Sequence, residues 1–144
     1  MKIFLSYSIL NRKLAAQLKD GLKKYGQEVF MAHEDINPSI KWKERILKEL
    51  DICPVFVALL TENFRGSEWT DQETGIAIAK DKLIIPLMLK NEPHGFMSRN
   101  QALKIKEDDI ESACFKIMET IVSEGRFTKK IKNDVIKSFG QSNS

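Results

Sequence analysis

Short apolar runs alternate along this chain with stretches in which apolar residues recur every third or fourth position. The runs predict five β-strands, at residues 2–7, 27–31, 52–60, 83–89 and 102–106. The recurring positions predict helices whose apolar faces are Leu14, Leu18 and Leu22; Trp42, Ile46 and Leu50; and Ile110, Ala113 or Cys114, Ile117 and Ile121. A further helix is expected at about residues 70–80. A short one is expected after Gly125, where Ile131, Val135 and Phe139 share a face.

Local signals place several boundaries of these elements. Asn11 and Ser39 precede two of the helical patterns and can serve as N-caps, and Gly26 follows the first pattern as a stop. Residues 32–40 are expected to form a polar loop, residues 90–101 an irregular segment, and residues 140–144 a disordered end. Strands that alternate with helices indicate a parallel sheet with right-handed crossovers. We therefore expect an α/β fold, a flavodoxin-like three-layer sandwich with strand order 2-1-3-4-5.

The composition is that of one globular domain, with 42% hydrophobic and 30% charged residues in a chain of 144. No apolar run approaches the roughly 20 residues that span a bilayer, and the first residues lack the apolar core of a secretory signal. Cys53, in the third predicted strand, and Cys114 match no metal or redox spacing, so both are expected to be buried thiols. These observations predict a cytoplasmic protein that does not act at a membrane.

The net charge of +3 comes from the end of the chain. From Gly125 onward five cations oppose one anion, which leaves a formal charge of −1 on the first 124 residues. A near-neutral body does not favour binding to nucleic acid. We therefore expect a folded domain at residues 1–124 and a basic tail at residues 125–144 that is a solvated appendage.

Several chemistries common in this fold lack their motifs here. No GxxxxGK[ST] phosphate loop is present, and the first strand ends in Ser6-Tyr7-Ser8 and not in GxGxxG. The acidic strand ends of a phospho-accepting receiver domain are missing as well. His33 and His94 have no further ligands at metal-binding spacing, and neither cysteine has an evident base. The sequence therefore predicts no metal site.

One acidic residue stands where this fold places its ligands. Glu73 follows Trp69 by four residues in the third predicted helix, so both would share a face at the carboxyl end of the sheet. A carboxylate there could accept hydrogen bonds from a ribose and stabilise positive charge at its anomeric carbon. The same spacing also fits a capping box, in which Thr70 caps the helix and Glu73 bonds back to its amide. Spacing alone does not separate the two interpretations.

Other strand ends would add hydroxyl groups and aromatic rings to the same edge. The candidates to contact a ligand are Ser6, Tyr7, Ser8, Phe30, Asp35, Ser67 and Trp69. Core packing is the alternative for the aromatic residues, and Asp35 could instead order its loop as an Asx-turn residue. Trp42 is interpreted as a core residue.

Four segments resemble the small prokaryotic form of the Toll/interleukin-1 receptor (TIR) domain. They read IFLSYS at residues 3–8, VFMAHEDINPS at 29–39 with Trp42 after it, ALLTENF at 58–64, and SEWTDQE at 67–73. The segments IIPL at 84–87 and PHGF at 93–96 add to the similarity. The resemblance covers roughly residues 1–124, in the order and spacing typical of the family.

The resemblance implies an activity. Many prokaryotic TIR domains cleave the bond between nicotinamide and ribose in NAD+, releasing ADP-ribose or a cyclic relative, often as an antiphage signal for a downstream effector. The family's catalytic glutamate corresponds to Glu73, and its BB loop, which can contact a neighbouring subunit, corresponds to residues 32–40. The resemblance therefore implies a homo-oligomer with NAD+ as substrate and no separate cofactor.

Two positions depart from the family pattern, and other functions stay open. Ser8 stands where several NAD-cleaving relatives carry a basic residue, and Pro38-Ser39 where many carry Pro-Gly. These changes bear on contacts to the substrate's phosphates and on the BB loop, which gates the site in the family. The main alternative is an adaptor that only binds other TIR domains. A third possibility is nucleoside glycosyl transfer, which a related fold performs with a glutamate nucleophile.

Overall fold

The structure, a computed structural model, describes residues 1–33, 39–62, 68–89 and 102–142, with the backbone alone at residues 68–71 and 140–142. Its strands are β1 (Lys2–Tyr7), β2 (Glu28–His33), β3 (Val55–Leu60), β4 (Leu83–Met88) and β5 (Leu103–Lys104). Its helices are the 3-10 turn η1 (Ile9–Asn11), α1 (Arg12–Lys23), α2 (Ile40–Ile52), α3 (Glu68–Ala79), α4 (Ile110–Glu124) and α5 (Thr128–Ser142). The sheet order is β2-β1-β3-β4-β5, and every neighbouring pair is parallel.

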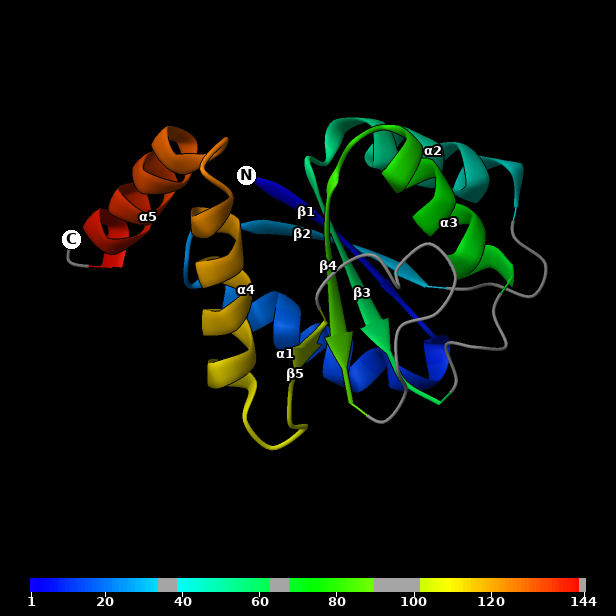
Figure 1. The fold of residues 1–144 in the computed structure, drawn as a ribbon, viewed down its shortest axis with the longest axis horizontal. Helices are drawn as coiled ribbons and strands as arrows, with labels where there is room; N and C mark the ends of the chain where they lie inside the picture. Colours follow the sequence, from blue (N-terminus) through cyan, green and yellow to red (C-terminus); the bar gives the residue numbers. More distant parts are fainter. Residues whose placement is uncertain (34–38, 63–67, 90–101, 143–144) are drawn as a thin grey trace.

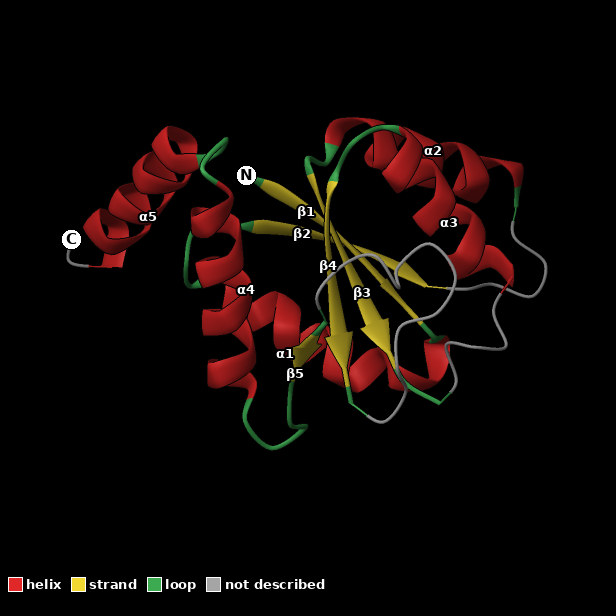
Figure 2. Cartoon of the chain, in the orientation of Figure 1, coloured by secondary structure: helices red, strands yellow, loops and turns green. Residues whose placement is uncertain are grey.

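The sheet is the middle of three layers (Figure 2). Helices α2 and α3 cover one face, α1 and α4 cover the other, and α5 lies beside α4 at the end of the chain (Figure 1). The α/β flavodoxin-like architecture and the strand order predicted from the sequence are therefore confirmed.

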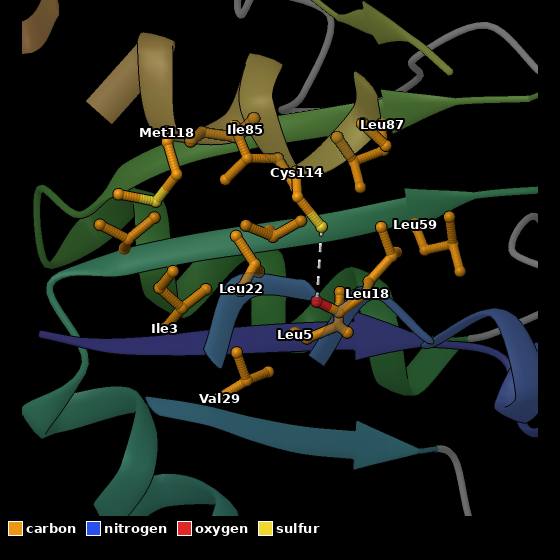
Figure 3. Close-up of a cluster of buried hydrophobic side chains, with 14 of the residues drawn as sticks. Ile3, Leu5, Leu18, Leu22, Val29, Leu59, Ile85, Leu87, Cys114 and Met118 are labelled. Carbon is orange, nitrogen blue, oxygen red and sulfur yellow. Dashed lines mark hydrogen bonds between the residues drawn. The ribbon is translucent and has the colours of Figure 1, made fainter. Parts of the chain in front are cut away.

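Each face of the sheet has its own hydrophobic core, because alternate strand residues point to opposite faces. Ile3 and Leu5 belong to the core that includes α1 and α4, whereas Phe4 belongs to the core that includes α2 and α3. Figure 3 shows the first of these cores, where the Cys114 thiol donates to the carbonyl oxygen of Leu18 at 3.6 Å. Strand parity therefore assigns each side chain near the carboxyl edge to one face or the other.

Several predicted strand boundaries differ from the observed ones, and two of the differences have a clear cause. β3 begins at Val55, because Ile52 ends α2. Cys53 is the C-cap of that helix and donates its N–H to the Glu49 carbonyl oxygen at 2.9 Å, so it is buried as predicted but lies outside the strand. β2 continues to His33, two residues past the prediction, because it keeps pairing with β1. Of the predicted polar loop at residues 32–40, residues 32 and 33 therefore belong to β2 and residue 40 to α2, and residues 34–38 lie outside the described residues.

The two predicted N-caps have different outcomes. Ser39 caps α2 as expected, since its hydroxyl accepts a hydrogen bond from the Trp42 N–H at 3.0 Å. Asn11 precedes α1, but its side chain makes no cap bond. Its oxygen accepts instead from the Thr61 hydroxyl at 2.7 Å, which ties the start of α1 to the end of β3.

The basic end of the chain is packed on one face and is not simply a solvated appendage. α5 has 15 residues, more than the short helix predicted, and residues 140–142, expected to be disordered, are helical. Ile131 is 3% exposed within the core that includes α1 and α4. Asp134 pairs with the Met1 ammonium group, and the Ser138 hydroxyl donates to the Lys24 carbonyl oxygen at 2.9 Å. The lysines of α5 remain exposed on the other face of the helix.

Helices α1 and α4 approach closely at Gly21, where a methyl group would lie 2.5 Å from the Cys114 sulfur. We expect Gly21→Ala to destabilise the protein by about 1–3 kcal/mol, the usual range for overpacking, despite the better helix propensity of alanine. In a Cys114→Ala background the sulfur is absent, so Gly21→Ala should stabilise the protein through the better helix propensity of alanine. Chemical denaturation of the wild type, the two single variants and the double variant measures the coupling between the two substitutions. The same effect of Gly21→Ala in both backgrounds would contradict the steric explanation.

Candidate functional site

Glu73 places a buried carboxyl group on α3. It is 2% exposed, and both carboxylate oxygens are shielded from solvent. Ala77, one turn later, belongs to the core that includes α2, so this side of α3 faces the sheet. The helix begins at Glu68, so Thr70 is already inside it and the capping-box interpretation is wrong. Burial of this carboxyl group therefore has a reason other than helix capping.

Glu49 on α2 is the other buried acid among the described residues, and its role is structural. Its carboxylate lies 2.7 Å from the Lys2 ammonium nitrogen and 3.0 Å from the Arg45 guanidinium. Burial acts to raise the pKa of Glu49, but the hydrogen bonds and charges of Lys2 and Arg45 outweigh it and hold the pKa below its ordinary value. This cluster lies at the amino end of β1, away from the carboxyl edge.

We expect Glu49 to make the fold acid-sensitive. Its folded-state pKa lies below the unfolded value of about 4.3, so its contribution is present above that value and is lost as pH falls through the folded-state pKa. Glu49→Gln should flatten the fall in Tm between about pH 5 and pH 3. Glu44→Gln, an exposed control on the same helix, should leave the profile unchanged. Calorimetry across this range would contradict the expectation if Glu49→Gln kept the slope of the wild type.

A row of small side chains crosses the sheet near its carboxyl end, on the face that α3 covers. Ser6 pairs in register with Ala32 on β2 and Ala58 on β3, and Ala58 pairs with Pro86 on β4. By strand alternation these residues share the face of Phe4. Ser6 is fully buried, and its hydroxyl has no hydrogen-bond partner among the described residues. The buried Ser6 hydroxyl therefore lies between small side chains of the neighbouring strands.

The structure places Tyr7 on the face opposite Ser6. Tyr7 belongs to the core with α1 and α4, where burial raises its pKa above the ordinary value and the Arg12 charge partly opposes that shift. Ser8 is buried and caps η1, accepting from the Leu10 N–H at 3.4 Å. The three consecutive candidates are thus directed to different surroundings, and ligand contacts of Tyr7 and Ser8 stay predictions.

Phe30 and Trp42 belong to an aromatic cluster at the carboxyl end of β2. The Trp42 ring centroid lies 5.8 Å from that of Phe30 and 5.0 Å from that of His33. The Arg45 guanidinium lies over the Phe30 ring, 5.4 Å from its centroid. The Trp42 ring is packed, as the sequence predicts, but its indole N–H is buried and has no hydrogen-bond partner in the described part of the chain. Hydrophobic periodicity carries no signal for that group.

Three of the predicted site residues cannot be placed by their side chains. Asp35 and Ser67 lie outside the described residues, as does the side chain of Trp69. α3 contains both Trp69 and Glu73, so their spacing puts them on one face of a helix, as predicted. Ligand contacts of Asp35, Ser67 and Trp69 stay predictions, and so does the catalytic role of Glu73.

A cleft that the sequence pattern does not mark lies between the β4–β5 end and α4. It has a volume of about 650 Å³, and Lys104, Lys106, Lys116 and Asp109 contribute to its lining. Lys116 donates to the Lys104 carbonyl oxygen at 3.0 Å, and Asp109 caps α4. Several polar groups of the cleft thus serve the local fold, and neither Glu73 nor Ser6 lines it.

Neither cysteine has the properties of a nucleophile. Burial, together with the Glu49 carboxylate, raises the pKa of Cys53 to about 12, and burial raises the pKa of Cys114 to about 11.

Within the described ranges, no three His, Cys, Asp or Glu side chains are grouped so as to hold a metal ion. None of the helices in those ranges has the length and hydropathy of a membrane-spanning segment.

Comparison with protein families gives a match over most of the chain. A family model described as TIR domain matches residues 3–118, from β1 into α4. No curated protein matches the chain.

Solved structures share the fold at low sequence identity. The TIR domain of the Toll-related receptor TRR-2 from Hydra magnipapillata is 15% identical with a TM-score of 0.65, over 84% of this chain and 97% of that one. The CMP N-glycosidase BcmB of Clostridium botulinum is 21% identical with a TM-score of 0.58, over 78% and 97%. The TIR domains of the activated Roq1 resistosome are 16% identical with a TM-score of 0.54, over 95% and 82%. At these identities the likeness establishes the fold.

Proposed function

This chain belongs to the TIR domain family, and on that premise we propose that it cleaves the bond between nicotinamide and ribose in NAD+. The products are nicotinamide and ADP-ribose, or a cyclic relative of ADP-ribose. The observation that supports this proposal best is the position of Glu73. It follows Trp69 by four residues on α3, the spacing of the family's catalytic glutamate, and its carboxyl group is buried.

The proposed chemistry needs one carboxylate. Breaking the C1′–N bond leaves both bonding electrons on the nicotinamide nitrogen, so the base departs neutral and positive charge develops on the ribose. The Glu73 carboxylate stabilises that charge, and low-dielectric surroundings strengthen the interaction. Water then adds to C1′ and loses a proton, or a nitrogen of the adenine ring adds there to give a cyclic product.

Substrate must reach a side chain that is 2% exposed. In this conformation the Glu73 carboxylate does not face solvent, so catalysis requires a rearrangement that uncovers it. We propose that contact with a neighbouring subunit supplies the rearrangement, which makes a homo-oligomer the active form. The rate per protomer would then rise with protein concentration.

We propose residues 1–124 as the TIR domain and residues 125–144 as an addition to it. The family match ends at residue 118, within α4, and α4 ends at Glu124. Gly125, with φ of 84°, separates α4 from α5. We extend the proposal to the role that the resemblance implies, an antiphage signal sensed by a downstream effector.

Two alternatives are distinct in their chemistry. An adaptor would bind other TIR domains and cleave nothing, which would leave the carboxyl group of Glu73 without a reaction to perform. Cleavage of a nucleoside monophosphate would break the same kind of C1′–N bond, and it is the reaction named for the Clostridium botulinum structure.

Incubation of the purified chain with NAD+ or with CMP, followed by chromatography of the released base, tests the proposal. We expect nicotinamide from NAD+, at a rate per protomer that increases with protein concentration. Cytosine from CMP without nicotinamide from NAD+ would favour the nucleoside monophosphate alternative. Release of neither base at any concentration would favour the adaptor.

A further inference from the structure

Two buried polar groups on the side of the sheet that α2 and α3 cover lack the hydrogen bonds that their burial requires. They are the Ser6 hydroxyl and the Trp42 indole N–H, and neither has a partner among the described residues. Native proteins seldom bury a polar group without a partner, because it gives up its hydrogen bonds to water and gains none in return. Such a group in a folded chain indicates that a ligand, an ion or an ordered water completes it.

The strand register of Ser6 and the ring contacts of Trp42 place these groups in the same part of the sheet. The Trp42 ring packs against the rings of Phe30 and His33, so it lies along the end of β2, next to Ala32. Ala32 pairs in register with Ser6 on the neighbouring strand. Ser6 is therefore one strand away from the indole, on the face that α2 and α3 cover. Ser6 thus belongs to the row of small side chains at the carboxyl edge, and the indole lies at the β2 end of that row.

Gln27 is a buried side chain whose unpartnered oxygen does not indicate a ligand site. Its side-chain oxygen also has no partner among the described residues, but its amide nitrogen donates to the Tyr25 carbonyl oxygen at 2.9 Å. It also precedes β2, at the amino end of the sheet. Ser6 and Trp42 differ because they lie together at the carboxyl edge, where this fold binds its ligands.

The chemistry of the two groups selects the kind of ligand. An indole N–H only donates, whereas a serine hydroxyl both donates and accepts. An anion is not favoured, because the nearby Arg45 guanidinium is already bonded to Glu49 at 3.0 Å and the Glu73 carboxyl group lies on the same face. A sugar hydroxyl, which accepts from one group and donates to the other, satisfies both.

We propose that Ser6 and Trp42 together bind a ribose hydroxyl of the ligand. The Trp42 N–H donates to the ribose oxygen, and the ribose hydroxyl proton is donated to the Ser6 oxygen. This assigns a binding role to Trp42, beyond its packing in the core, and gives the ribose a fixed position on the face that carries Glu73. The assignment rests on the proposed function for the identity of the ligand, but binding can be measured without catalysis.

The chain has two tryptophans, so a ¹H–¹⁵N spectrum contains two indole N–H signals, and Trp42→Phe assigns them. ADP-ribose is the probe, because it carries the ribose hydroxyls and no nicotinamide to lose. We expect it to shift the Trp42 indole proton downfield, as a new hydrogen bond does. Trp42→Phe and Ser6→Ala should each weaken ADP-ribose binding at least about fivefold, the loss expected for one hydrogen bond.

Gln27→Leu is the matched control, since it removes the unpartnered group at the opposite end of the sheet. It should leave the affinity for ADP-ribose unchanged, and all three variants should keep a cooperative unfolding transition. The inference is overturned if ADP-ribose leaves the Trp42 signal in place, or if Trp42→Phe and Ser6→Ala bind it as tightly as the wild type. An ordered water would then complete the two groups.

The outcome separates this inference from the proposed function. Nicotinamide release by the wild type, with no shift of the Trp42 signal, would support the function and overturn the inference. A shift with ADP-ribose, in a protein that releases no nicotinamide, would support the inference and overturn the function.

Discussion

Gly26→Ala is expected to lower Tm much more than Gly125→Ala, although both changes replace a glycine of positive φ. The angle is 77° at Gly26 and 84° at Gly125, so each substitution places a side chain in the left-handed region at a cost of about 1–2 kcal/mol. A Cβ at Gly125 meets nothing within 4 Å. A Cβ at Gly26 would lie 2.5 Å from the backbone carbonyl oxygen of Asp134 in α5. That oxygen cannot rotate away, so α5 must move.

A shift of α5 would expose the apolar side chains that are buried where this helix packs against the rest of the protein. Ile131 is 3% exposed, and losing the burial of such a side chain costs about 1.5–3 kcal/mol. The bond from Ser138 to Lys24 depends on the same docking. Gly26→Ala should therefore destabilise the protein by about 3–5 kcal/mol in total. At about 3 °C per kcal/mol for a chain of this size, its Tm should fall about 5–9 °C further than that of Gly125→Ala.

Thermal unfolding of the two variants measures the difference. Hydrogen exchange shows its cause, because amides of residues 128–139 should lose protection in Gly26→Ala and keep it in Gly125→Ala. Equal losses of Tm, with the amides of α5 protected in both variants, would contradict the prediction that Gly26→Ala displaces α5.

Most strands and helices follow from hydrophobic periodicity, the strand order follows from their alternation, and the errors fall where periodicity gives no signal. Leu14, Leu18 and Leu22 predict the buried face of α1 because each is one turn from the next. The run at residues 52–60 misplaces the start of β3, because a buried helix end and a buried strand are both apolar. Periodicity therefore identifies elements better than it separates neighbours.

The end of the chain was predicted from its charge, and charge does not report packing. The lysines of α5 are exposed, as a basic tail implies, but Ile131 and Val135 lie one turn apart and pack against the rest of the protein. The same two residues predict the helix from the sequence. What the sequence could not supply is the surface of α1 and α4 that receives them.

The candidate site could be predicted only in part. The position of Glu73 on α3 followed from its spacing to Trp69, whereas its deep burial required the structure. Strand alternation sends Ser6 and Tyr7 to opposite faces, a consequence of the two-residue period that grouping them by strand end ignores. The unsatisfied N–H of Trp42 could not be predicted, because it depends on which groups surround the ring in space.

Glu73→Gln separates chemistry from folding. The substitution keeps the shape of the side chain and removes its negative charge, so nicotinamide release should fall at least about 10²–10³-fold, as when another electrostatic stabiliser is removed. Tm should change little, because glutamine keeps the volume of the side chain and one of its two hydrogen-bonding oxygens. Glu49→Gln, the same change at the other buried acid among the described residues, is the matched control. It should lower Tm, since it leaves Lys2 and Arg45 without their carboxylate, and keep the activity of the folded protein.

The rate of nicotinamide release from NAD+, measured for the wild type and for Glu73→Gln at the same high protein concentration, decides whether the Glu73 carboxylate takes part in the reaction. We expect release by the wild type and none above background by Glu73→Gln, at a Tm close to that of the wild type. Equal release by the two proteins would contradict it, because the carboxylate of Glu73 would then have no part in breaking the bond.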